Sequence, residues 1–133
     1  MRHEVTIISD DCRLEVGNKI SLSGIYDEAI VFRSLPARVL KLCLYQRWSD
    51  FPTPEIVTII VRGAPIGDLE LRGEAKPSAP PKAGLQARIM AAFGPIDFIS
   101  DGTLSFGTLL GNDQEPIYVH KLSVRIDPNL KID

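Results

Sequence analysis

The chain has 133 residues, a length typical of one domain, which we expect to span residues 1–133. The formal net charge is -2, and basic residues occur singly rather than in a stripe, which argues against a nucleic-acid binder. No apolar run approaches the ~20 residues that a membrane-spanning helix needs. Residues 1–4 are not followed by the apolar core of a signal peptide, so the expected location is cytoplasmic.

The first patterned stretch runs from Ile8 to Phe32 and contains the clearest alternation in the chain. Residues 19–23 read Lys-Ile-Ser-Leu-Ser, which places Ile20 and Leu22 on one face of a predicted strand over 19–25. Gly24 ends this alternation and predicts a bulge or a close backbone approach. We predict neighbouring strands over 4–9 and 29–32.

Residues 9–15 are less regular, and for them a single helical turn capped by Ser9 or Asp10 is the favoured interpretation. Asp10 and Asp11 are adjacent in the sequence. If this segment were extended instead, their side chains would point to opposite faces and would not form a catalytic pair. Cys12 has no histidine near it in the sequence, so we do not predict a nucleophile there. Cys12 and Cys43 are both expected to be free thiols.

The same block resembles the opening of an uncharacterised bacterial or phage family, a domain of unknown function whose members read D-D-x-R-x-E-x-G-x-K-x-S-L-x-G. The matching residues here are Asp10, Asp11, Arg13, Glu15, Gly17, Lys19, Ser21, Leu22 and Gly24. Pro36, Leu40, Lys41 and Leu42 are similar to the family's next motif. The resemblance covers the first third of the chain well. It implies a small all-β sandwich and no known activity.

Further along the chain we predict strands over 38–47, 55–62 and 66–73. In the first of them Leu40, Leu42 and Leu44 are expected to face one side, and in the third Leu69 and Leu71 are expected to face inward. The strand over 55–62 is apolar on both faces, which indicates a central strand or one at an interface. Residues 48–54 are predicted to form a loop, with Trp48 and Phe51 over one end of the core.

The C-terminal half begins with a proline-rich loop over 76–84. Residues 85–93 fit either a helix or a strand, and the all-β context favours a strand. A short extended piece is predicted over 96–99, followed by strands over 104–110 and 116–126. The fold class is therefore predicted to be an all-β, single-domain antiparallel sandwich of about eight or nine strands, immunoglobulin-like or a related Greek key.

The sequence contains no phosphate-binding loop, no G-x-S-x-G, no H-E-x-x-H and no C-x-x-C, so we predict no enzyme activity and no cofactor. His3 and His120 fall on the first and last strands, but two histidines are more often structural than metal ligands. Calcium at one end of a sandwich is a better-motivated alternative. The carboxylates near predicted strand ends are Asp10, Asp11, Asp27, Glu28, Asp50, Asp101 and Asp113.

The leading functional hypothesis is a non-catalytic sandwich that acts through a protein partner or through self-association, helped by a hydrophobic strand near a sheet edge. The first alternative is a calcium- or lipid-binding module resembling the C2 class. The second is a ligand-binding protein or small hydrolase, in which Cys12 joins Asp10, Asp11 and Arg13 in a pocket with His3 or His120. The predicted interaction or ligand surface, with no metal assigned to it, is Asp10, Asp11, Arg13, Glu15 and Lys19.

Overall fold

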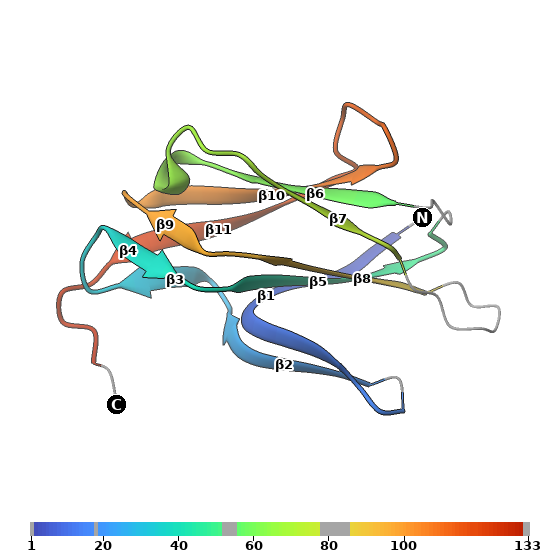
Figure 1. Ribbon diagram of the computed structural model, residues 1–133, viewed down its shortest axis with the longest axis horizontal. Coiled ribbons are helices and arrows are strands. Elements are labelled where there is room, and N and C mark those ends of the chain that lie inside the picture. The colour runs from blue at the N-terminus through green and yellow to red at the C-terminus, as the bar shows by residue number, and fades with distance from the viewer. Residues whose placement is uncertain (1, 18, 52–55, 78–85, 132–133) are drawn as a thin grey trace.

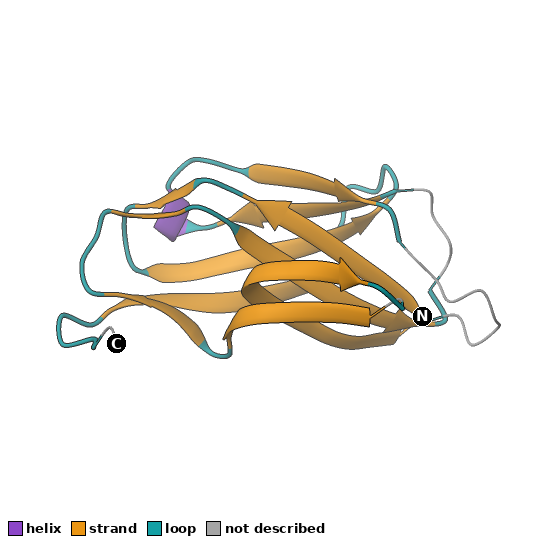
Figure 2. Cartoon of the chain, turned by 60° about the horizontal axis from the view of Figure 1, so that its bottom comes forward, coloured by secondary structure: helices purple, strands orange, loops and turns teal. Residues whose placement is uncertain are grey.

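The computed structural model consists mainly of β-strands, whose apolar and polar residues alternate along the chain. Most of these strands form two sheets that pack against each other (Figures 1 and 2). The structure describes residues 2–17, 19–51, 56–77 and 86–131. The four-stranded sheet has the order β2 (Lys19–Tyr26), β1 (Arg2–Glu15), β5 (Leu42–Ser49), β8 (Ala87–Phe93). The five-stranded sheet has the order β3 (Ala29–Phe32), β11 (Tyr118–Ile126), β10 (Gly102–Leu110), β6 (Val57–Arg62), β7 (Leu71–Ala75).

A short pair, β4 (Ala37–Val39) with β9 (Ile96–Phe98), lies at one end of the molecule (Figure 1). The prediction of an all-β sandwich is confirmed. The described residues form eleven strands rather than eight or nine, and one pair, β3 with β11, is parallel rather than antiparallel. One turn of 3-10 helix, η1 (Ala64–Ile66), is shown in purple in Figure 2.

The core lies between the two sheets and is made of the inward side chains of both. Val57, Ile59 and Val61 of β6 are fully buried there, as are Leu104 and Phe106 of β10. β6 is paired along both sides, so it is the central strand that its two apolar faces indicated. The four-stranded sheet contributes inward residues chiefly from β5 and β8, namely Leu42, Leu44, Trp48, Ala87, Ile89, Ala91 and Phe93. Residues 87–93 therefore form the strand that the all-β context favoured.

The helical turn predicted over residues 9–15 is wrong, because β1 continues without interruption to Glu15. Residues 8–15 pair with β2 in one register that runs from Ile8 opposite Tyr26 to Glu15 opposite Lys19. Backbone groups that a helical turn would bond within itself are therefore bonded across the hairpin. Ser9 and Asp10 suggested a helix cap when this segment was considered by itself. The extended conformation is instead set by pairing with β2, which follows later in the sequence.

The predicted strand over 38–47 is in fact two strands in different sheets. β4 pairs with β9, and the chain then crosses into the four-stranded sheet at Leu42. Leu42 and Leu44 are buried as expected, whereas Leu40 lies at the crossing and is 79% exposed. The strand over 66–73 is also shorter than predicted. Leu69 precedes β7 and is 53% exposed, so its predicted inward position is wrong.

Trp48 belongs to the end of β5 rather than to a loop, while Phe51 lies beyond that strand. Both side chains are almost fully buried and their rings are 5.4 Å apart, which confirms that they cover part of the core. Pro52 and Pro54 of that predicted loop lie outside the described residues, as do residues 78–84 of the proline-rich loop.

Candidate functional site

The distal halves of β1 and β2 form a two-stranded arm, defined as residues 10–15 and 19–25, which extends away from the sandwich (Figure 1). β1 pairs with β5 only between Arg2 and Ser9. In the described part of the chain, β1 beyond Ser9 therefore has β2 as its one strand partner, and β2 is the last strand of its sheet. Leu14, Val16 and Ile25 are 61%, 94% and 49% exposed on or beside this arm.

All five residues of the predicted surface lie on this arm. Asp11 and Arg13 are brought together, with Arg13 Nε 2.7 Å from Asp11 Oδ2. Glu15 and Lys19 are cross-strand partners at the tip. The side chains of Asp10 and Asp11 point to opposite faces of the strand, as expected for neighbours in an extended chain. The Asp10 carboxylate accepts a hydrogen bond from Tyr26 Oη rather than joining the Asp11 pair.

Lys41, which the sequence analysis placed in the second family motif but not in the predicted surface, joins the base of the arm to the start of β5. Its Nζ lies 2.6 Å from Asp11 Oδ1. The hydrogen bond from Lys41, followed by that from Arg13, lowers the pKa of Asp11 to about 2. Asp11 is therefore ionised at neutral pH and is held between two cations, so its arrangement fits a structural ion cluster and not a general acid.

Replacing Lys41 with methionine is expected to raise the pKa of Asp11 from about 2 toward its usual value of about 3.9. Because the folded-state pKa is lowered, the contribution of Asp11 to stability is present above about pH 3.9 and is lost as the pH falls through 2. Carboxyl-carbon NMR titration of the folded protein measures the shift. Arg13→Gln is the comparison and should produce a smaller rise; an unchanged Asp11 pKa in Lys41→Met would contradict this assignment.

Gly24 is required by the geometry at the base of the arm. Its φ is +66°, and a Cβ atom at this position would overlap the Asp10 carboxylate. The group that approaches Gly24 is the side chain of Asp10, rather than the backbone that the sequence predicted. Burial, strengthened by the bond to Asp10, raises the pKa of Tyr26, so that the phenol is a hydrogen-bond donor at neutral pH.

The cysteines and histidines do not assemble a reactive centre with the aspartates. Both thiols are free, and burial together with the neighbouring Cys43 raises the pKa of Cys12 to about 12. A thiol with so high a pKa is a poor nucleophile at neutral pH. His3 lies seven residues before Asp10, about 20 Å along an extended strand. The pocket that a small hydrolase would need is therefore not formed by these residues.

His3 instead belongs to an aromatic cluster between the two sheets. Its ring is stacked on Tyr118 with centroids 3.8 Å apart, and it meets the Trp48 ring edge-on at 5.2 Å. Burial lowers the pKa of His3 and also that of His120. Across the described ranges, no group of three or more His, Cys, Asp or Glu side chains is placed to hold a metal ion. Asp10 and Asp11 lie within β1 rather than in loops, unlike the arrangement expected for calcium.

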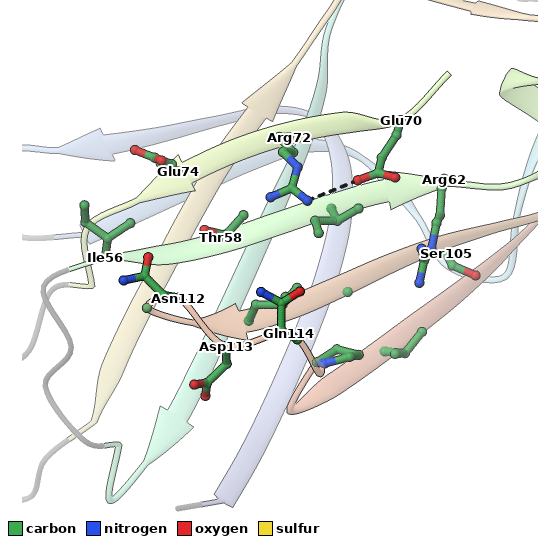
Figure 3. A pocket seen from close by; sticks show the side chains of 16 residues that line it. Ile56, Thr58, Arg62, Glu70, Arg72, Glu74, Ser105, Asn112, Asp113 and Gln114 are labelled. Carbon is green, nitrogen blue, oxygen red and sulfur yellow. Dashed lines mark ion pairs between the residues drawn. The ribbon is translucent and has the colours of Figure 1, made fainter. Parts of the chain in front are cut away.

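The doubly apolar strand β6 does not provide a free edge, and that part of the interaction hypothesis is corrected. β6 lies between β10 and β7 and is paired along both sides, so it has no edge to offer another chain. Its outward residues Ile60 and Thr58 instead line an open groove on the outer face of the five-stranded sheet (Figure 3). Among the described strands, β2 ends the four-stranded sheet and carries Ile25, 49% exposed, while β3 ends the other sheet and carries Val31, 36% exposed.

No family model matches the sequence, and no curated protein matches it significantly. No helix among the described residues is long and apolar enough to cross a membrane.

Proposed function

We propose that the protein is a non-catalytic module that acts by self-association, with the free edge of β2 in one copy pairing with β2 of a second copy. The observation that carries this proposal is the arm itself, which leaves the sandwich with an unpaired edge and exposed apolar residues. A two-stranded ribbon alone is marginally stable in water, and a third strand is the usual means of stabilising it. The resemblance of this segment to a family signature is consistent with a role for the arm.

The edge of β2 lacks the features that usually prevent strand addition. Proteins block edge strands with proline, several charges or inward-pointing ionic groups. Between residues 19 and 26 there is no proline, and Lys19 at the tip is the one charged residue. Ser21 and Ser23 are exposed and small, so a second strand can approach along this edge without desolvating charge.

β2 is also complementary to itself in an antiparallel arrangement. If Leu22 of one copy lies opposite Leu22 of the other, Ser21 faces Ser23 and Lys19 faces Ile25. No like charges meet in this register, and serine pairs contribute favourably across strands. The pairing would join two four-stranded sheets into one continuous sheet about a twofold axis, which is the commonest symmetry of soluble homo-oligomers.

A pair of double variants at the same two positions tests this register. In Ser21→Lys with Ser23→Lys, lysines of the two copies face each other, and we expect dimerisation to weaken by about tenfold or more. In Ser21→Glu with Ser23→Lys, each new carboxylate faces a new ammonium group of the other copy, and the dimer should persist. Sedimentation velocity over a concentration series measures both, with far-UV circular dichroism to verify that each variant remains a β protein.

Two results would overturn the proposal. A wild-type protein that sediments as a monomer at high micromolar concentration does not self-associate through any edge. A dimer that both double variants leave unchanged uses a different surface.

A further inference from the structure

The outer face of the five-stranded sheet, opposite to the core, carries an open groove with a volume of about 840 Å³ (Figure 3). β7 forms one wall, and the loop of residues 111–116 between β10 and β11 forms the other. The floor follows the sheet register, in which Ile60 lies beside Gly107 and Gly107 beside Val119. The groove belongs to a different sheet from the arm, so binding in the groove does not depend on the proposed self-association.

The fold does not require glycine at position 107, in the middle of this floor. A Cβ atom at Gly107 would meet Pro116 Cβ at 3.6 Å and the Ile60 carbonyl oxygen at 3.9 Å, which are ordinary contacts. Gly73 is different, because its Cβ would lie 2.8 Å from the Phe93 ring. Glycine inside a strand weakens it and often marks a place where a ligand approaches closely. The absence of a side chain at Gly107 deepens the groove at its centre.

One end of the groove holds several basic side chains and one acidic side chain, Glu70, which lies at the Arg62 end in Figure 3. Arg62 and Ser105 are cross-strand partners there, and Lys121 is the next residue in the same row of the sheet. Arg72 lies near this end and is paired with Glu70 at 3.4 Å. Among the described residues, Arg62 makes neither an ion pair nor a side-chain hydrogen bond. Glu74, Asn112 and Asp113 lie toward the other end in Figure 3.

We propose that this groove binds a small organic carboxylate, with the carboxylate at Arg62 and Ser105 and a compact apolar body over Gly107 and Ile60. A guanidinium group presents two parallel N–H donors that match the two oxygens of a carboxylate, and the Ser105 hydroxyl adds a donor beside them. Two acidic residues, Glu74 and Asp113, lie toward the other end, whereas Glu70 at this end is paired with Arg72. The reversed orientation of the same ligand is therefore disfavoured. Ile60, Leu109 and Val119 supply the apolar contact that a largely concave ligand site requires.

The test uses phenylacetate as the probe and phenylacetamide, which has the same shape without the charge, as its control. Protein-observed NMR titration of the full chain should give saturable shifts of groove residues with phenylacetate and at least about tenfold weaker binding of the amide. Arg62→Gln should weaken phenylacetate binding by a similar factor. Arg47→Gln, which removes an exposed arginine from the four-stranded sheet, should leave binding unchanged.

Gly107→Val separates a role in binding from a role in folding. Valine suits a strand and its Cβ fits, so the melting temperature should not fall, whereas its methyl groups fill the groove and phenylacetate binding should be lost. Three results would overturn the proposal: no saturable binding of phenylacetate, equal binding of the amide, or full binding by a folded Gly107→Val variant. Self-association of the variant, measured by sedimentation, is expected to equal that of the wild type.

Discussion

Replacing Phe98 with alanine is expected to lower the free energy of unfolding by about 4 kcal/mol, because a phenyl group is removed from a fully closed environment. Phe98 is 0% exposed in β9, and its ring lies 5.1 Å from the ring of Phe32 in β3. It thereby connects the short β4–β9 pair to the edge of the five-stranded sheet. The cavity left by alanine would lie between β9 and β3, so packing at the β4–β9 pair and at the edge of the five-stranded sheet would both be weakened.

Urea unfolding followed by tryptophan fluorescence and by circular dichroism measures this loss. Ile99→Ala is a matched control, because Ile99 is the next residue and is 58% exposed. Its truncation should change the free energy of unfolding by no more than about 0.5 kcal/mol. If Phe98→Ala cost as little as Ile99→Ala, β9 would not be part of the cooperative core.

Gln46→Ala is expected to lower the free energy of unfolding by about 3 kcal/mol, although the residue it changes is polar. Gln46 is 0% exposed in β5, among the inward residues of the four-stranded sheet. Its Oε1 accepts hydrogen bonds from Trp48 Nε1 at 3.2 Å and from Thr108 Oγ1 of the opposite sheet at 3.1 Å. Alanine leaves both donors buried without this acceptor and also leaves a cavity.

Thr108→Val is the matched control for Gln46→Ala. Valine keeps the shape of threonine and removes one donor, while the bond from Trp48 to Gln46 remains, so the expected loss is about 1 kcal/mol. Both variants are measured by urea unfolding at the same pH. Within the described residues, Gln46 Nε2 has no hydrogen-bond partner, so burying this amide also has an unfavourable free energy. If Gln46→Ala were as stable as the wild type, this unfavourable term would be as large as the stabilisation from the two hydrogen bonds to Oε1.

Much of the fold was predictable from alternation. Residues 29–32 form the predicted strand, and residues 19–26 extend the predicted one by a single position. Residues 87–93, whose pattern fitted a helix or a strand, form the strand that the all-β context favoured. Alternation reports burial of one strand face, which is a local property that each strand shows by itself. The five residues of the predicted surface were also found together on one arm, because they are close in the sequence and share one hairpin.

The tertiary structure decided the features that depend on which strand lies next to which. The continuation of β1 through Glu15 depends on β2, and the division of residues 37–49 between two sheets depends on β9 and β1. Gln46 became an inter-sheet acceptor only because Thr108 faces it from β10. The groove unites Arg62, Gly107 and the loop over 111–116, none of which indicates a binding site by itself. The physical reason is that strand pairing depends on hydrogen bonding and packing between residues far apart in the chain. A local sequence pattern therefore does not specify which strands pair.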